Sequence, residues 1–306
     1  MNALSLPLTS TQIWPELHLA NWAETRDTLH MWVQIVGHVR MVLSPPVNHW
    51  WHVTLYVTSR GLTTSPIPHA DHTFEVHFDF LDHRLVIATS RNERRALKLE
   101  PKSVADFHGE FMRLLGELGI QVKIHSKPDE VTDPIAFAED RVHRSYDPEF
   151  ARRFWQVLVA TDSVLKEFRG RFIGKCSPVH FFWGSFDLCC TRFSGRRAPE
   201  RPGADAMTRE AYSHEVISGG FWPGGGAVND AAFYAYAAPE PQGFRNARIL
   251  PPSAKYNDGF GEYILMYEDM RLAPDPKQAL LDFLQSTYEA GATLGSWDRA
   301  ALEREA

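Results

Sequence analysis

The sequence contains few cysteines. There are three, Cys176, Cys189 and Cys190, too few and too closely spaced for a disulfide framework. This indicates a reducing compartment. The start of the chain lacks the basic region and continuous apolar run of a signal peptide, and no later segment reaches the roughly 18 apolar residues of a membrane span. We therefore expect a cytoplasmic protein that does not cross a membrane.

The chain also lacks an excess of positive charge, because 32 Lys and Arg are outnumbered by 38 Asp and Glu, which gives a net charge of -6. Nucleic acids and anionic membranes require clustered Lys and Arg, so neither is an expected partner. Signature motifs are missing as well: there is no G-x-S-x-G, H-E-x-x-H, paired C-x-x-C or kinase signature. The glycine-rich stretch 219–226 lacks the Lys-Ser or Lys-Thr pair of a phosphate-binding loop. No cofactor or metal can be assigned from motifs.

The composition is that of a globular protein, with 44% hydrophobic residues, 23% charged residues and nine Trp. Hydrophobic spacing predicts a helix, then strands, then a helix in residues 1–126, and the same order in residues 147–306. Ser103, Asp147 and Asp275 are expected helix N-caps. Residues 127–146 carry prolines and charges without periodicity, and we interpret them as a connector.

Short matched segments indicate that the two halves arose by internal duplication. Ile35-Val36-Gly37 precedes the run PVNHWW (46–51), and Phe172-Ile173-Gly174 precedes the run PVHFF (178–182). We predict an α+β fold of two similar halves, each an antiparallel sheet backed by helices, packed as one unit.

Four runs carry a family resemblance: TLHMWVQIVG, NHWWHVTLYVTSRGLTTS, GKCSPVHFFWGSFDL and YSHEVISGGFWPGGG. Together they resemble an uncharacterised bacterial family catalogued as a domain of unknown function. The resemblance extends from Trp14 to Trp297 and implies a bacterial protein that forms a single unit. It implies no activity and no site residues.

The matched segments predict one strand written twice, at residues 48–59 and again at 177–197. Each copy is expected to have one apolar face and one mixed face, because side chains alternate along a strand. In the first copy Trp50, His52, Tyr56 and Arg60 share the mixed face. In the second copy it carries Phe181 and the set Trp183, Ser185, Asp187, Cys189 and Thr191. Aromatic rings mixed with a few polar groups are typical of a ligand pocket. Two alternatives to a pocket remain. The mixed faces would also be buried if the two sheets packed on each other or against a second subunit.

Candidate catalytic residues follow from these faces, with Glu215 expected on the mixed side of its own strand and His214 toward the core. We assign His52 as general base and Glu75 or Glu215 as the carboxylate that orients it. His52, Glu75 and His77 could also hold zinc or iron, but shared faces arise by chance among 14 histidines, so we assign no metal. The predicted ligand-binding residues are Trp50, Tyr56, Arg60, Trp183, Ser185, Asp187, Arg196 and Trp222. Arg196 would bind an anion, and Trp222 would either close a glycine-rich lid or pin a wide turn.

Three function classes remain open. One is an enzyme acting on a small polar or anionic metabolite in a pocket between the sheets. The second is a ligand binder without catalysis, and the third is a homo-oligomeric scaffold whose mixed faces are buried against a partner. The sequence does not determine whether the protein is an enzyme.

Overall fold

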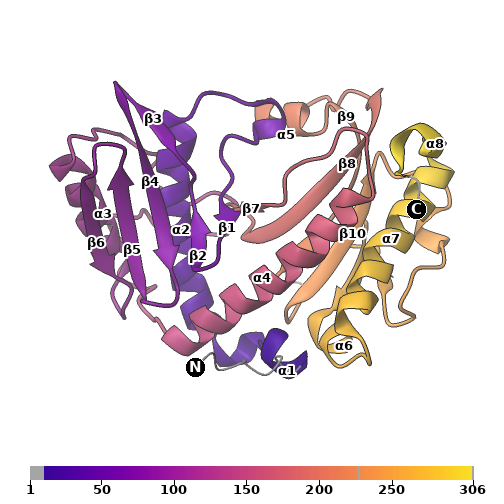
Figure 1. Ribbon diagram of the computed structural model, residues 1–306, viewed down its shortest axis with the longest axis horizontal. Coiled ribbons are helices and arrows are strands. Elements are labelled where there is room, and N and C mark those ends of the chain that lie inside the picture. The colour runs from indigo at the N-terminus through magenta and orange to yellow at the C-terminus, as the bar shows by residue number, and fades with distance from the viewer. Residues whose placement is uncertain (1–9, 227, 305–306) are drawn as a thin grey trace, which may run out of the picture.

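Each half of the chain has a long helix near its start, a six-stranded antiparallel sheet, and a further helix after the sheet (Figure 1). The computed structural model describes residues 10–226 and 228–304. The predicted α+β class, with two antiparallel sheets backed by helices, is confirmed. The extreme N-terminus, on which the expectation of no signal peptide depends, lies outside the described residues.

The described residues of the first half form three α-helices and six strands. The helices are α1 (Ser10–Ile13), α2 (Ala23–Leu43) and α3 (Val104–Glu117), with short 3-10 turns at Leu19–Asn21 and Asn48–Trp50. The strands are β1 (Tyr56–Val57), β2 (Gly61–Thr63), β3 (Ile67–His69), β4 (His72–Asp79), β5 (Arg84–Thr89) and β6 (Arg94–Lys98). The sheet order is β1-β2-β4-β5-β6, with β3 also paired to β4.

The second half is built in the same way with additional short helices. Its helices are α4 (Pro148–Gly170), α5 (Ala206–Ala211), α6 (Tyr267–Arg271), α7 (Pro276–Leu294) and α8 (Arg299–Leu302), with a 3-10 turn at Phe244–Asn246. Its strands are β7 (His180–Phe182), β8 (Asp187–Arg197), β9 (His214–Trp222), β10 (Ala232–Ala238), β11 (Lys255–Asn257) and β12 (Glu262–Met266), in the order β11-β12-β10-β9-β8-β7.

The long helices begin where the sequence predicts. The Ser103 hydroxyl accepts a hydrogen bond from the Asp106 amide at 3.1 Å, and the Asp147 carboxylate accepts one from the Glu149 amide at 2.8 Å. Asp275 caps α7 in the same way. Each cap satisfies amide groups that have no partner within the helix.

Apolar side chains from both halves form one continuous core. In the first half Trp32 of α2 stacks on Phe107 of α3, with ring centroids 4.8 Å apart. In the second half Phe154 of α4 stacks on Phe186 at 5.2 Å. Fully burying one such side chain contributes roughly 1.5–3 kcal/mol, so these contacts hold α2 against α3 and α4 against the β7–β8 hairpin.

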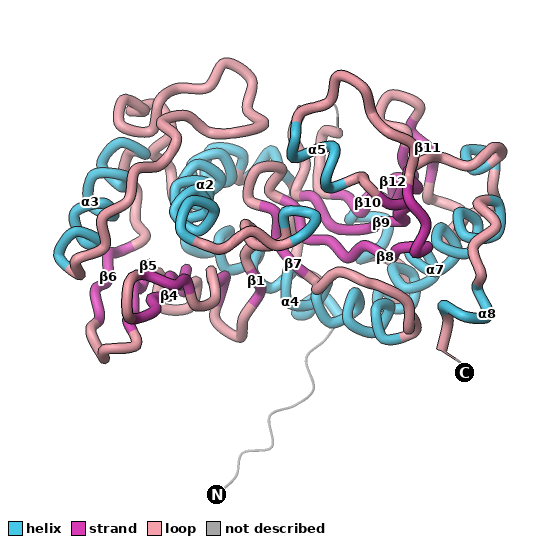
Figure 2. The backbone as a smooth tube through the Cα atoms, turned by 90° about the horizontal axis from the view of Figure 1, so that it is seen from above, coloured by secondary structure: helices cyan, strands magenta, loops and turns pink. Residues whose placement is uncertain are grey.

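The two sheets meet edge to edge and not face to face. The amide of Leu55 donates to the carbonyl of Phe181 at 2.9 Å, and the amide of Phe181 donates back to the carbonyl of Leu55 at 2.8 Å. Figure 2 shows α2 and α3 on one side of the first sheet, and α4 and α7 on the opposite side of the second. The helices therefore cover opposite faces of the two sheets.

The predicted strand through residues 48–59 is wrong over most of its length. His49 and Trp50 both have positive φ angles, 59° and 61°, and the chain makes a 3-10 turn there before the two-residue strand β1. A left-handed conformation ends an extended strand, so the predicted alternation of Trp50 and His52 does not occur. The matching run 178–182 does contain a strand, and the internal duplication stays a prediction.

The hairpin of β7 and β8 corrects another face assignment. Residues 183–186 form its turn, with Phe186 at a φ of 62°. Phe181 pairs with Leu188, and Phe182 pairs with Asp187. Phe181 therefore lies on the apolar face and not on the mixed face as predicted, because the turn resets the alternation. The predicted shared face of Asp187, Cys189 and Thr191 is confirmed.

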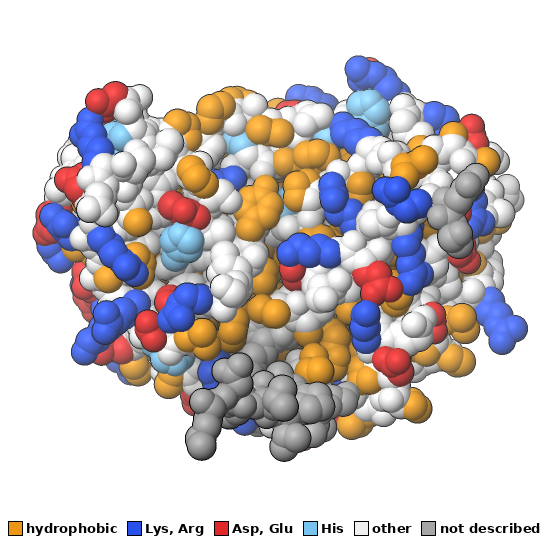
Figure 3. All heavy atoms as spheres, in the orientation of Figure 1, with side chains coloured by type: hydrophobic (Ala, Val, Ile, Leu, Met, Phe, Trp, Pro, Cys, Tyr) orange, Lys and Arg blue, Asp and Glu red, His pale blue; other side chains and the backbone are white. Residues whose placement is uncertain are grey.

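None of the described helices is long and apolar enough to cross a membrane. Figure 3 shows basic, acidic and apolar side chains interspersed on the face of the molecule that is seen in Figure 1.

Candidate functional site

The second sheet has one face packed against helices and one face rich in polar side chains. α4 and α7 lie in front of β8 to β10 in Figure 1, and α5 lies on the other side of the sheet in Figure 2. The strand pairing places one set of side chains on the face away from α4 and α7. We call this set the polar face; it comprises His180, Asp187, Cys189, Thr191, Ser218, Gly220, Tyr234, Tyr236 and Glu262.

Asp187 is the most deeply buried carboxylate of the polar face, with 7% of its surface exposed. The Ser185 hydroxyl donates to Asp187 Oδ1 at 2.5 Å, and the Tyr234 hydroxyl donates to Oδ2. Burial raises the pKa of the Asp187 carboxyl, while these hydrogen bonds act in the opposite direction. The hydrogen bonds hold the carboxyl group in one orientation.

Gly220 allows Tyr234 to reach Asp187 across an intervening strand. Gly220 of β9 lies between Tyr234 of β10 and Cys189 of β8 in the register. A Cβ atom on Gly220 would lie 2.8 Å from the Tyr234 hydroxyl oxygen and 2.3 Å from the carbonyl oxygen of Leu188. Only a residue without a side chain leaves room for the phenol at this position.

Two further carboxyl groups, Glu130 and Glu262, interact electrostatically with Asp187. Among the described residues neither has a hydrogen-bond or ion-pair partner for its carboxyl group. Burial, and then repulsion from Asp187, raises the pKa of Glu262 to about 7. The same two effects, with Asp129 in addition, raise the pKa of Glu130 to about 6. Glu130 keeps an exposed side, so water moderates its shift.

A stripe of polar residues on α2 positions Glu130. The Gln34 side chain donates to the carbonyl of Asp129 at 2.8 Å and accepts from its amide at 2.8 Å. His38 Nε2 lies 3.1 Å from the Asp129 carboxylate. Glu130, the next residue, has a φ of 55°, which a non-glycine residue adopts only when its surroundings hold it there.

The same stripe also holds the β7–β8 hairpin. His30 Nε2 lies 2.9 Å from the carbonyl oxygen of Gly184, and burial lowers the pKa of His30 to about 4. Trp183 packs on Gly37 of α2, where a Cβ atom would lie 2.3 Å from its ring. A Cβ atom on Gly184 would lie 2.7 Å from Glu130 Oε1, so the connector and the hairpin are in contact. One helix thus places Glu130 next to the hairpin that carries Asp187.

The structure separates the predicted catalytic residues. His52 is buried near the junction of the sheets, where its Nδ1 accepts from the Val47 amide at 3.2 Å. Glu75 lies on the outer face of the first sheet and accepts from Thr63 Oγ1 at 2.5 Å. His77 Nε2 lies 3.1 Å from Glu75, so the predicted shared face of these two residues is confirmed. His52 is not among the partners of Glu75, and His52 and Glu75 therefore form no acid–base pair.

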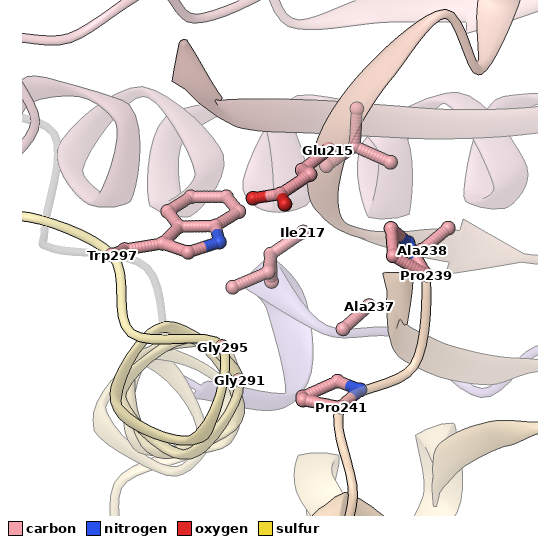
Figure 4. Close-up of a pocket in the computed structure, with 10 residues that line it drawn as sticks. Glu215, Ile217, Ala237, Ala238, Pro239, Pro241, Gly291, Gly295 and Trp297 are labelled. Carbon is pink, nitrogen blue, oxygen red and sulfur yellow. The ribbon is translucent and has the colours of Figure 1, made fainter. Parts of the chain in front are cut away.

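Glu215 lies away from the polar face, next to α7. The alternation predicted for its strand is reversed, because Val216 and Ser218 share the polar face and Ile217 lies against Gly291 of α7. Arg196 Nη2 forms an ion pair with Glu215 at 2.6 Å and also donates to the carbonyl of Gly295. Figure 4 shows Glu215 and Trp297 beside a small cavity of about 70 Å³. Arg196 here caps the end of α7.

The predicted ligand-binding residues are divided among several sites. Ser185 and Asp187 are hydrogen-bonded to each other at the polar face, and Trp222 ends β9 on that face. Trp183 is buried and donates from Nε1 to the carbonyl of Val53 at 2.7 Å. Trp50 contacts His52, with ring centroids 5.3 Å apart.

Tyr56 and Arg60 lie on the outer side of the first sheet. The Arg40 guanidinium lies 5.8 Å from the centroid of the Tyr56 ring, and Arg60 Nε pairs with Asp79 at 2.6 Å. Arg60, His77, Asp79 and Arg94 are among the residues lining an open depression of about 390 Å³. The charge of Arg60 is already compensated by Asp79 and Asp82, so Arg60 is not free to bind an anion there.

Sequence reasoning missed Glu130, Tyr234 and Glu262. Glu130 lies in the connector, where no periodicity indicates a face. The available signal was the pair Gly219-Gly220 inside a strand, followed by the alternation of small and aromatic residues in β10. Glycine within a strand often marks a close approach of another group. The residues described by the structure contain no group of three or more His, Cys, Asp or Glu arranged to hold a metal ion.

A model of the family of unknown function DUF5996 matches residues 14–304, and the chain belongs to that family. The resemblance inferred from the sequence is therefore confirmed. No curated protein and no solved structure matches the chain.

Proposed function

We propose that the polar face of the second sheet binds a small polar molecule and transfers protons to or from it, so that the protein is an acid–base enzyme. The observation that carries this proposal is the arrangement of three carboxyl groups. Asp187 is fixed by Ser185 and Tyr234, while Glu130 and Glu262 interact electrostatically with Asp187 and, within residues 10–226 and 228–304, have no hydrogen-bond or ion-pair partner for their carboxyl groups. Raised carboxyl pKa values in one place are typical of functional sites.

The roles of the three groups follow from their protonation. A general acid or base is most effective when its pKa lies near the working pH. The pKa of Glu262, about 7, makes it the candidate proton donor and acceptor at neutral pH. Glu130 is the second candidate, and Asp187 with Tyr234 orients the bound molecule.

The charge of the polar face limits the ligand. Around Asp187, Tyr234 and Glu262 the polar face carries no Lys or Arg, Lys255 being confined to the edge strand β11, and carboxylates repel an anion. The tyrosine rings of β10 stack on each other, with centroids 6.2 Å apart, and are half-buried. These features favour a neutral hydroxylated molecule or an amine over the anionic metabolite considered from the sequence.

The test is a ligand screen with matched variants. Saturation-transfer NMR against a panel of small polyols, sugars and amines, followed by turnover assays, is run on wild type and on Glu262→Gln. Glu75→Gln is the control, because Glu75 is a carboxylate on the outer face of the first sheet. We expect a ligand whose turnover is lost in Glu262→Gln and retained in Glu75→Gln.

Other outcomes separate the alternatives. Binding at the polar face without turnover would identify a non-catalytic ligand binder. A stable homo-oligomer in light scattering, disrupted by Tyr236→Ala and lacking any ligand, would favour the scaffold. Turnover unchanged in Glu262→Gln would overturn the acid–base assignment.

We also propose that the protein is cytoplasmic. The three cysteines are free thiols, which supports this location.

A further inference from the structure

A group of basic side chains gathers at one end of the second sheet, away from the carboxylates of the polar face. Lys175 precedes β7, Arg197 ends β8 and His214 begins β9. Arg197 and His214 are directly paired across the two strands. We call these three residues the basic cluster.

His49 is a buried residue next to the basic cluster, and it fixes the position of Lys175. His49 is 5% exposed, and its Nδ1 lies 3.1 Å from the carbonyl oxygen of Glu210 and 3.2 Å from that of Ala211. Carbonyl oxygens only accept hydrogen bonds, so the proton of the imidazole is on Nδ1. Nε2 then carries the lone pair, and it accepts from Lys175 Nζ at 2.8 Å.

Two aromatic rings also contact the ammonium group of Lys175. Its Nζ lies 5.5 Å from the centroid of the Trp51 ring and 5.0 Å from that of Phe193. The backbone is held as well, since the Phe193 amide donates to the carbonyl of Lys175 at 3.0 Å. A neutral imidazole and two ring faces orient the cation without neutralising it.

No carboxylate neutralises the basic cluster. Within residues 10–226 and 228–304, Lys175, Arg197 and His214 take part in no ion pair, whereas neighbouring Arg196 is paired with Glu215. His214 is close to the other charges: its ring centroid lies 5.6 Å from that of His49. Burial, then Lys175 and Arg197, lowers the pKa of His214. His214 is therefore mainly neutral at pH 7, and the uncompensated charges are those of Lys175 and Arg197, which a bound anion would stabilise.

We propose that the basic cluster is a binding site for a phosphate group, with Lys175 as the central charge and Arg197 and His214 as flanking donors. Three donors from three segments suit the three free oxygens of a phosphate monoester better than the two oxygens of a carboxylate. His49 acts as a positioning residue that holds Lys175. This site is independent of the acid–base proposal, because it shares no residue with the carboxylate group.

Isothermal titration calorimetry with inorganic phosphate tests the site in the full-length protein. The variants are Lys175→Ala and, as a control with the same loss of charge, Lys255→Ala, since Lys255 is exposed on β11 and donates to the Pro252 carbonyl. Loss of a hydrogen bond to a charged group weakens binding by roughly ten- to a hundredfold, which we expect for Lys175→Ala alone. Acetate, titrated in parallel, should bind more weakly than phosphate.

Three results would overturn the proposal. One is no phosphate binding by wild type up to about 10 mM, the range of a weak single site. Another is equal weakening by Lys175→Ala and Lys255→Ala, which would show attraction to net charge only. The third is acetate binding as tightly as phosphate. Circular dichroism of each variant confirms that it is folded, and His49→Asn, which keeps a residue suited to positive φ, should weaken phosphate binding in the same direction as Lys175→Ala.

Discussion

The hydroxyl of Tyr234 passes over Gly220 and donates a hydrogen bond to the carboxylate of Asp187. These two residues lie on strands separated by β9, and the contact exists because the intervening position has no side chain. Asp187 is buried and receives a second hydrogen bond from Ser185. The contact therefore connects strand pairing directly to the chemistry of the polar face.

Replacing Gly220 by Ala should destabilise the protein and break this contact. The new Cβ would lie 2.3 Å from a backbone oxygen and 2.8 Å from the Tyr234 hydroxyl, so strands or phenol must move. Overpacking of this kind costs about 1–3 kcal/mol. We expect the free energy of unfolding, measured by urea denaturation, to fall by that amount.

Gly109→Ala is the matched control for Gly220→Ala. Gly109 is an exposed residue within α3, and a Cβ there would meet nothing within 4 Å. Alanine in a helix interior is favoured over glycine by about 0.5–1 kcal/mol. A Gly220→Ala variant as stable as Gly109→Ala would contradict the close approach at Gly220.

The stability of the protein should depend on Glu262 between pH 5 and pH 8. The carboxyl titrates near 4.5 when unfolded, and its pKa in the folded protein is about 7. The folded state binds the proton more tightly, so the contribution of Glu262 to stability is lost as the pH rises through 7. The loss is up to about 3 kcal/mol, reduced by the partial exposure of the side chain.

Urea denaturation of wild type and Glu262→Gln at both pH values isolates this contribution. Glutamine does not titrate, so the variant should gain stability relative to wild type as the pH rises. Taking the difference between the two proteins removes the effect of histidines that titrate in the same range. Curves that stay parallel from pH 5 to pH 8 would show that the pKa of Glu262 is not raised.

His180→Leu should protect the protein against acid. His180 is fully buried, neither ring nitrogen has a hydrogen-bond partner in the described part of the chain, and burial lowers its pKa to about 3. The unfolded chain takes up a proton near pH 6.5, so stability is lost as the pH falls below that value. At pH 5 this amounts to about 2 kcal/mol.

Leucine removes the titration without removing a hydrogen bond. We therefore expect His180→Leu to match wild type within about 1 kcal/mol at pH 7.5 and to exceed it at pH 5. Urea denaturation at the two pH values is the measurement. A large loss of stability at pH 7.5 would instead mean that His180 makes a polar contact in solution.

Iodoacetamide should modify Cys176 well before the other two cysteines. Cys176 is partly exposed, and a hydrogen bond with Cys190, then Arg192 and Arg169, lowers its pKa. Cys189 and Cys190 are buried and their pKa values are raised. Thiolates are the reactive form, so Cys176 should react at least about tenfold faster in the native protein.

Peptide mass spectrometry over a time course measures these rates. In denaturant, where burial is removed, the three cysteines should react at similar rates. Equal rates in the native protein would place Cys176 in a different environment from the one described.

Sequence patterns predicted the local features of this protein because those features depend on neighbouring residues. The helix caps at Ser103, Asp147 and Asp275 are hydrogen bonds between residues close in sequence. Alternation within β8 correctly placed Asp187 and Thr191 on one face. The α+β class followed from the order of these elements.

Only the tertiary structure determined which residues of the candidate site lie close together. Residues 48–59 are rich in β-branched and aromatic side chains, yet contacts of His49 with Glu210 and Lys175, distant in sequence, hold a left-handed turn. Glu130 lies in a segment without periodicity and is positioned by Gln34 through its neighbour Asp129. Residue spacing encodes which face a side chain takes within one strand or helix. Contacts between residues far apart in the chain depend on the packing of whole elements, and that packing brings Glu130, Asp187 and Glu262 into electrostatic contact.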